Sequence, residues 1–295
     1  MLSENYLIGF KRYALYEKEI TPKATQSIIN STKKLFEVTN IENLKDITTD
    51  IIRGYLYDQK EQRLWTAKTF RNKRQHLKSF FDYCVSHEYI SKNPVEKIGK
   101  PKLPKTTPRF IKTQDLLFII AHTELYPWRY EVERTRNNAI ISTFLFTGMR
   151  LSELLNLQLT DVNIEEQEII IKKGKGKKER IVPIHHKLLP QLKRYLKERK
   201  RCKNQSIWFF QSLKLPTQIT PKTIHIICKK ISKASGVKFT PHNLRHSFAR
   251  GCMNSGLGLY QTKEILGHAS VSTTEIYLSI AKNTLKKSFS EAVLV

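Results

Sequence analysis

Apolar residues recur at helical spacing through the first ninety residues of the chain. The pattern predicts four helices, at residues 3–17, 25–39, 48–60 and 67–87. Thr21 followed by Pro22 indicates where the second helix begins, because threonine caps a helix and proline is tolerated in its first turn. The apolar faces of the second and fourth helices hold Ile28, Ile29, Leu35, Phe36, Phe70, Leu77, Phe80, Phe81 and Cys84.

From about residue 110 the pattern becomes mixed. Two β-rich runs, residues 168–172 and 179–184, flank a turn rich in glycine and lysine and therefore predict a hairpin. Helices are predicted on both sides of it, at 113–126 (with Thr113 as its cap), 136–147, 151–157, 187–201, 221–235, 241–254, 260–266 and 272–280. The predicted fold is mainly α with a small antiparallel β-sheet, in the α+β class.

Residues 91–109 read as a linker. Prolines and lysines alternate there, which favours an extended, semi-rigid and cationic segment. We therefore expect a helical domain at residues 1–90 and a second domain at 110–295, which ends in a tail at 283–295.

Composition narrows the class of protein. Hydrophobic residues make up 40% of the 295, which is typical of a globular chain, and no apolar run is long enough to span a bilayer. The N-terminus has no secretory signal pattern. The four cysteines form no C-x-x-C pair, which argues against a zinc ribbon or a disulfide framework and favours a reducing, cytoplasmic location.

Charge indicates the partner. Lysine and arginine number 52 against 26 acidic residues, a net charge of +26, which favours a polyanion such as DNA over a small metabolite. The alternatives are a ribosome-associated or merely basic protein, and binding to a membrane surface, although no basic amphipathic helix carries the apolar Trp/Phe face that such binding needs. The residues that we expect to contact DNA lie on the fourth helix, in the linker and in the hairpin turn: Lys68, Arg71, Arg74, Lys100, Lys102, Lys105, Lys173 and Lys177.

Four separated motifs carry candidate chemistry. The first reads T-G-M-R-L-S-E-L and presents Arg150 at the start of a helix, where a guanidinium can bind a phosphate through two hydrogen bonds. Glu153, three residues later, can hold that guanidinium in place. The alternative is an ordinary surface ion pair. The second motif is the hairpin turn, in which Lys175 lies between two glycines and could protonate a leaving oxygen.

The third motif, T-P-H-N-L-R-H, opens a helix and places His242 and Arg245 on one face near the N-terminal amide groups, which favour an anion. His242 and His246 also have the spacing of a zinc pair, but no third ligand accompanies them, so we expect no metal. The fourth motif is L-G-H at residues 266–268, followed nine residues later by Tyr277. A single tyrosine on a helix is more often part of a core than a nucleophile.

Together, in this order and at these intervals, the four motifs resemble the active site of the tyrosine recombinase (phage integrase) family, and in particular its compact Xer-type members. The resemblance covers essentially the whole chain. It implies that Tyr277 is the nucleophile that joins to DNA, that Arg150, Arg245, His242 and His268 bind the phosphate, and that Lys175 is the general acid.

The resemblance also implies partners and a setting. A helical core-binding domain and a catalytic domain would form a C-shaped clamp on double-stranded DNA, with no metal, ATP or small-molecule cofactor and no membrane. Recombination would take place in a homotetramer, or in a heterotetramer with a related recombinase, in which the tail at 283–295 docks on a neighbour or on its own domain. A cytoplasmic, nucleoid-associated enzyme of DNA integration, excision or dimer resolution is expected.

Two rival functions remain open from sequence. A type IB topoisomerase uses the same phosphotyrosine chemistry but needs no second DNA site. A DNA-binding regulator could also keep the fold without cleaving DNA. Covalent attachment to a nicked duplex separates the regulator from the two enzymes.

Overall fold

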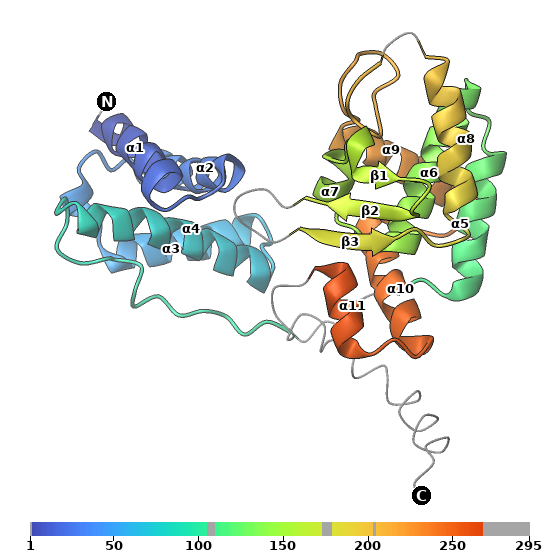
Figure 1. The fold of residues 1–295 in the computed structure, drawn as a ribbon. Coiled ribbons are helices and arrows are strands. Elements are labelled where there is room, and N and C mark those ends of the chain that lie inside the picture. The colour runs from blue at the N-terminus through green and yellow to red at the C-terminus, as the bar shows by residue number, and fades with distance from the viewer. Residues whose placement is uncertain (1, 105–109, 173–178, 203–204, 268–295) are drawn as a thin grey trace, which may run out of the picture. The chain divides into compact units, whose positions relative to one another are not determined.

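The computed structural model describes residues 2–104, 110–172, 179–202 and 205–267, and it divides into two compact units at residues 1–106 and 107–295. The helices and strands of each unit are drawn in Figure 1, and each unit has a hydrophobic core of its own. The mainly helical character and the small sheet that the hydrophobic pattern predicts are both confirmed.

Unit 1 is helical. Its described part consists of α1 (Leu2–Arg12) with a π-helical turn at Tyr13–Glu17, α2 (Pro22–Thr39), α3 (Thr49–Gln62) and α4 (Ala67–Ser86), joined in part by a 3₁₀ turn at Leu44–Asp46. The side chain of Thr21 accepts a hydrogen bond from the N–H of Ala24, so the predicted cap of α2 is confirmed.

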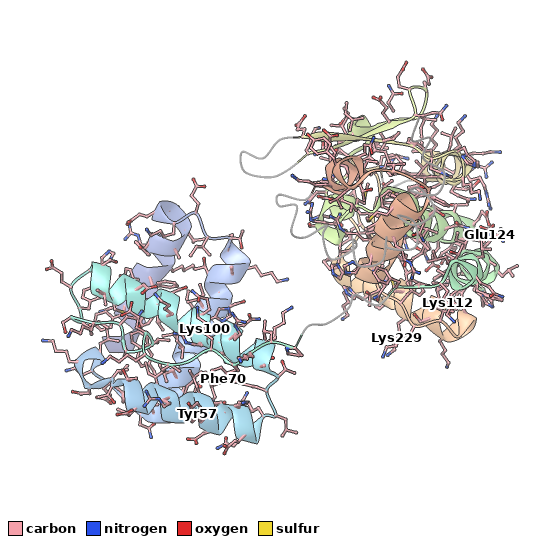
Figure 2. The ribbon with its side chains drawn as sticks, turned by 90° about the horizontal axis from the view of Figure 1, so that it is seen from below. Tyr57, Phe70, Lys100, Lys112, Glu124 and Lys229 are labelled. Atoms are coloured by element: carbon pink, nitrogen blue, oxygen red, sulfur yellow. The ribbon has the colours of Figure 1, made fainter. Side chains whose placement is uncertain are left out.

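Aromatic side chains fill the interior of unit 1. Phe80 of α4 meets Phe10 of α1 and Phe36 of α2 edge to face, with ring centroids 5.6 and 6.0 Å apart. Tyr57 of α3 and Phe70 of α4 form a separate, tilted ring pair, with centroids 6.3 Å apart (Figure 2). The first cluster joins α1, α2 and α4, and the Tyr57–Phe70 pair joins α3 to α4.

The chain that follows α4 does not leave unit 1 as an extended linker. Val95 and Ile98 are 0% and 2% exposed and belong to the core of that unit. Asn93 donates to the carbonyl of Lys78 at 3.1 Å and so attaches the segment to α4. The prediction of an extended segment from residue 91 is therefore wrong for residues 91–98, because two apolar side chains within it are buried.

Unit 2 contains α5 (Thr113–Leu125), α6 (Glu131–Thr147), α7 (Leu151–Leu155), α8 (Leu189–Lys200), α9 (Pro221–Ser235), α10 (Pro241–Asn254) and α11 (Leu259–Leu266) among its described residues. Most helix ends lie within two residues of the prediction, and two differences are more informative. Helix α6 begins five residues earlier than expected, and Lys112, not Thr113, is the cap of α5. The helix predicted at 272–280 lies outside the described residues.

The sheet of unit 2 is antiparallel. Its described strands are β1 (Val162–Asn163), β2 (Glu168–Ile171) and β3 (Arg180–Pro183), in that order. Ile169 pairs with Val182 and Ile171 with Arg180, so the predicted strands form a ladder with alternate residues facing the core. The two-residue strand β1 was not predicted, because it is too short for a periodic pattern. The turn at 173–178 lies outside the described residues.

Helix α6 is the centre of unit 2. Residues Thr135 to Leu145 are all buried, and helices α5, α8 and α10 pack around them (Figure 1). The helix ends at Gly148, in the left-handed conformation, and the chain then turns directly into α7. In the described part of the chain, no helix has both the length and the apolar character needed to cross a membrane.

Candidate active site

The turn between α6 and α7 positions Arg150. It depends on Gly148, whose φ of +60° is a conformation that other residues rarely adopt. A Cβ added there would clash with Cδ1 of Phe248 in α10, so the glycine also allows α10 to pack closely. The turn therefore fixes where α7 begins and where its first side chain lies.

Arg150 and Glu153 form a tight local pair. The backbone N–H of Arg150 donates to Glu153 Oε2 at 2.7 Å, and its guanidinium donates to Oε1 at 2.7 Å. The predicted contact is thus present, but it is more than a surface ion pair, since the Glu153 side chain is only 9% exposed. The Arg150 side chain is 39% exposed and can still meet an incoming anion.

Arg245 lies deeper. Thr240 caps α10 and accepts from the N–H of Asn243, as predicted, which sets the first turn of the helix. Arg245 is 6% exposed and donates to the carbonyl of Gly148 and, at 2.9 Å, to that of Leu266. A buried guanidinium needs such partners, and these two fix its orientation.

The C-terminal end of α11 brings the two arginines together. Arg150 donates to the carbonyl of Gly267 at 2.8 Å, next to the Leu266 carbonyl that Arg245 contacts. Two arginines from separate motifs therefore meet at one helix end. The next residue along the chain is His268.

The carboxylate of Glu153 is strongly stabilised in its charged form. Burial alone would raise the pKa of a carboxyl group, but hydrogen bonds from Arg180 and from the Arg150 N–H outweigh it and lower the pKa of Glu153 to about 2. Glu153 is therefore charged at neutral pH and holds the guanidinium groups around it.

His242 and His246 lie one turn apart on α10, with ring centroids 4.2 Å apart. His242 is exposed, whereas His246 is half-buried. Burial, together with His242 and Arg245, lowers the pKa of His246 to about 4, so this ring is neutral at physiological pH. Within the ranges that the structure describes, no three His, Cys, Asp or Glu side chains are grouped to hold a metal ion.

Three of the predicted catalytic residues, Lys175, His268 and Tyr277, lie outside the described residues, as do the predicted DNA contacts Lys105, Lys173 and Lys177. Their roles stay predictions. Of the described ones, the structure brings Arg150, Glu153 and Arg245 together and places His242 on the helix of Arg245.

One predicted DNA contact is wrong. Arg74 is 4% exposed and donates to the carbonyls of Val95, Glu96 and Ile98, so its guanidinium is occupied inside unit 1. The other basic side chains that we expected to contact DNA, and that the structure describes, are at least partly exposed: Lys68, Arg71, Lys100 and Lys102.

The sequence prediction missed Arg180. This arginine donates to both oxygens of Glu153, at 2.9 and 2.8 Å. The signal was its place in the predicted strand at 179–184, where alternation puts it on the same face as Val182 and Ile184. A charged residue at an inward position of a strand needs a buried partner.

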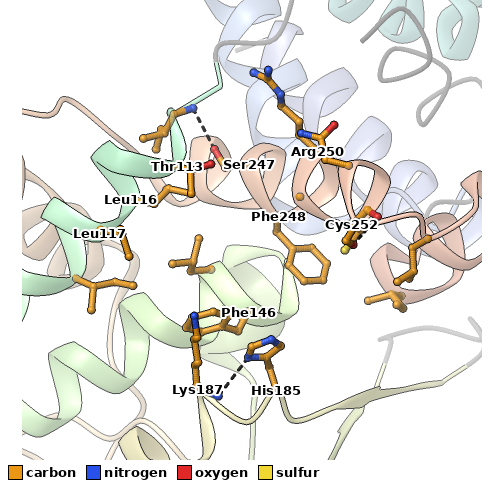
Figure 3. A pocket seen from close by; sticks show the side chains of 18 of the residues that line it. Thr113, Leu116, Leu117, Phe146, His185, Lys187, Ser247, Phe248, Arg250 and Cys252 are labelled. Carbon is orange, nitrogen blue, oxygen red and sulfur yellow. Dashed lines mark hydrogen bonds between the residues drawn. The ribbon is translucent and has the colours of Figure 1, made fainter. Parts of the chain in front are cut away.

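A separate cavity of about 870 Å³ opens in unit 2 (Figure 3). Leu116, Phe146 and Phe248 line it, while His185 and Lys187 add polar groups. Its mainly apolar lining does not suit a phosphate, and Arg150, Arg180 and Arg245 do not line it. The candidate active site is therefore the arginine cluster formed by these three residues at the end of α11.

Comparisons with known proteins show the family of this chain. The profile of the phage integrase family matches residues 109–284, more than half of the chain. Tyrosine recombinase XerA of Pyrococcus furiosus is 35% identical over 75% of this chain and 73% of its own length. Tyrosine recombinase XerC of Thermodesulfovibrio yellowstonii is 30% identical over 93% of this chain and 91% of its own.

Solved structures show the same fold. The XerH site-specific recombinase bound to its difH substrate, in a pre-cleavage complex, matches 92% of each chain with a TM-score of 0.73 at 22% identity. A lambda integrase dimer bound to a core site matches 92% of this chain and 97% of its own, with a TM-score of 0.67 at 19% identity. By the profile match and the identity to these relatives, the chain belongs to the phage integrase family of tyrosine recombinases.

Proposed function

We propose that this chain is a site-specific recombinase that cleaves and rejoins double-stranded DNA through a covalent bond to Tyr277. One observation carries the proposal: Arg150 and Arg245, from separate motifs, meet at the end of α11, from which the chain continues to His268 and Tyr277. Two oriented guanidinium groups suit the non-bridging oxygens of a phosphodiester.

The proposed reaction exchanges one ester bond for another. The Tyr277 oxygen attacks the scissile phosphorus, the bond to the 5′ oxygen breaks, and a 3′-phosphotyrosyl linkage and a free 5′-hydroxyl result. His242 accepts the phenol proton, Lys175 protonates the departing oxygen, and His268 donates a hydrogen bond to the phosphate. Because the bond energy is kept in the covalent intermediate, rejoining needs no ATP.

Charge neutralisation comes from the protein. Arg150 and Arg245 stabilise the charge that grows on the phosphate oxygens, and each such fixed donor is typically worth about 3 kcal/mol. Because two arginines and a lysine fill the role that a divalent cation has in many nucleases, we propose that cleavage proceeds in EDTA. Loss of activity on chelation would contradict this mechanism.

The larger assembly is proposed from family resemblance. The helical domain at residues 1–90 and the catalytic domain at 110–295 would grip the recombination site as a clamp, and a tetramer of this chain, alone or with a related recombinase, would exchange strands. The tail at 283–295 would dock on a neighbouring copy. The setting is the cytoplasmic nucleoid, in integration, excision or chromosome segregation.

The test is covalent capture. The chain is incubated with DNA of the organism that carries it, attached fragments are sequenced, and the mapped site is rebuilt as a nicked suicide duplex. The wild-type chain should form an adduct with this duplex, and Tyr277→Phe should bind it without forming one. An adduct from Tyr277→Phe would overturn the nucleophile, and DNA binding without any wild-type adduct would favour a regulator.

A two-site assay separates recombination from topoisomerase activity. Strand exchange between two copies of the mapped site is expected. Relaxation of supercoiled DNA that carries no such site, without exchange, would instead indicate a topoisomerase.

A further inference from the structure

Arg180 has no role in the reaction as proposed above, yet its guanidinium donates three hydrogen bonds within the candidate active site. It is the first residue of β3, and its side chain is only 8% exposed. Burying a guanidinium costs free energy unless its donors are satisfied. Its contacts therefore indicate what the buried charge does.

The first set of contacts is with Glu153. Both terminal nitrogens of Arg180 donate to this carboxylate, one to each oxygen, at 2.9 and 2.8 Å. The carboxylate also accepts from the backbone and the guanidinium of Arg150. Glu153 therefore binds two arginines, and its contact with Arg180 restricts movement of the carboxylate together with Arg150.

The second contact is with α11. The Nε–H of Arg180 donates to the carbonyl of Ile265 at 2.8 Å. A Cβ added to Gly267 would lie 2.7 Å from Nη1 of Arg180, so the guanidinium packs directly against the backbone of this glycine. Arg180 thus contacts Glu153 and the end of α11 at once.

The three arginines form one arrangement at that helix end. The carbonyls of Ile265, Leu266 and Gly267 accept from Arg180, Arg245 and Arg150 respectively. Arg180 differs from the other two because its guanidinium also donates to both carboxylate oxygens of Glu153, whereas the guanidinium of Arg150 contacts one of them. Its guanidinium therefore joins α7, β3 and α11 in a fixed geometry.

We propose that Arg180 is a positioning residue for strand cleavage: it holds Glu153, and through it Arg150, in register with the end of α11 that leads to His268 and Tyr277. This inference rests on the proposed function. Only a planar group with several fixed donors can bind both carboxylate oxygens and the Ile265 carbonyl together. A lysine at this position keeps the charge but loses that geometry.

The experiment uses the full chain and the nicked suicide duplex that carries its mapped site. Arg180→Lys is compared with Arg199→Lys, a matched control in the same unit. Arg199 is 3% exposed and donates to the carbonyls of Ser206 and Trp208, outside the arginine cluster. Single-turnover cleavage, DNA affinity and thermal unfolding are measured for each variant.

Arg180→Lys is expected to slow cleavage by about 100-fold, the loss that a misplacement of about 1 Å can cause. DNA affinity should change by less than about threefold, since the phosphate contacts of the clamp remain. Arg199→Lys should unfold at a temperature similar to that of Arg180→Lys but cleave at the wild-type rate.

A double-mutant cycle tests whether the effect passes through Arg150. If it does, Arg180→Lys should slow an Arg150→Lys variant by much less than it slows the wild type. Independent, multiplying effects would overturn the proposal, as would wild-type cleavage by a folded Arg180→Lys. If Arg180→Lys does not fold, Glu153→Gln takes its place, with the same slow cleavage and the same non-additivity expected, and wild-type cleavage by it overturns the proposal.

Failure of the proposed function looks different. In that case the wild-type chain forms no adduct with the suicide duplex, whatever residue stands at position 180.

Discussion

The Nε–H of Arg74 donates to the carbonyl oxygen of Ile98, 2.6 Å away, and fixes the chain after α4 against that helix. Arg74→Ala should therefore lower the free energy of unfolding of unit 1 by about 3 kcal/mol, because buried carbonyls lose their donor and a void is left. Hydrogen exchange across residues 2–104, compared with the wild type, measures the loss. Unchanged protection would contradict it.

Lys68 on the same helix provides the contrast. Its side chain is exposed, so Lys68→Ala should leave stability within about 0.5 kcal/mol of the wild type. If Lys68 contacts a DNA phosphate, the variant should bind DNA more weakly. A plot of the logarithm of the binding constant against the logarithm of salt concentration should then be less steep by about one unit. A salt series of binding constants decides this, and an unchanged slope removes Lys68 from the interface.

Arg245 should be needed for cleavage and not only for folding. A lysine at this position cannot hold the orientation set by the carbonyls of Gly148 and Leu266, so Arg245→Lys should slow adduct formation by about 100-fold or more. Arg250→Lys is the control, since Arg250 lies over the Phe110 ring at 5.2 Å, on the same helix and outside the cluster. Equal rates for the two variants would exclude a phosphate-binding role for Arg245.

The pKa of Glu153 predicts how stability depends on acid. This pKa falls from 4.5 to about 2 on folding, so the charged carboxylate stabilises unit 2 above pH 4.5 and this contribution is lost as the pH falls toward 2. The shift corresponds to about 3 kcal/mol. In denaturant titrations, Glu153→Gln should lose this part of the fall in the free energy of unfolding between pH 5 and 2.5. The same pH dependence in both proteins would rule out this role for Glu153.

Gly148 should tolerate no side chain. Gly148→Ala meets Phe248 and a φ of +60°, so it should lower the free energy of unfolding of unit 2 by at least about 1 kcal/mol. Gly251→Ala is the matched control, because a Cβ there meets nothing within 4 Å and the residue is inside α10. That change should stabilise the protein by about 0.5 to 1 kcal/mol. Thermal unfolding of both variants and the wild type measures this difference, and a Gly148→Ala variant as stable as Gly251→Ala would contradict it.

Hydrophobic periodicity predicted the helices of both units well, because long amphipathic helices repeat the same signal over several turns. It failed between residues 91 and 98, where Val95 and Ile98 stand alone among prolines and lysines. Two apolar residues three apart are too few for a periodic pattern, yet they are enough to bury the segment on α4. The misplacement of Arg74 follows from the same cause, since that segment covers it.

The sequence predicted some residues of the active site but not the contacts that hold them together. Arg150 and Arg245 were found because family motifs surround them, and the local pair of Arg150 with Glu153 follows from helical spacing. The contacts of these arginines with the carbonyls at the end of α11 were not predictable, because backbone acceptors leave no trace in a sequence pattern. Arg180 was visible only as a charge at an inward strand position.

The carbonyls that receive the three arginines have a consequence for how this region can vary in evolution. Every amino acid carries a backbone carbonyl, so exposed positions of α11 such as Glu264 can change type without altering the acceptors. A change of length is different. One residue inserted or deleted within α11 turns the following carbonyls by about 100° around the helix axis and carries them away from their donors. Relatives should therefore differ in this helix by substitution and keep its residue count constant.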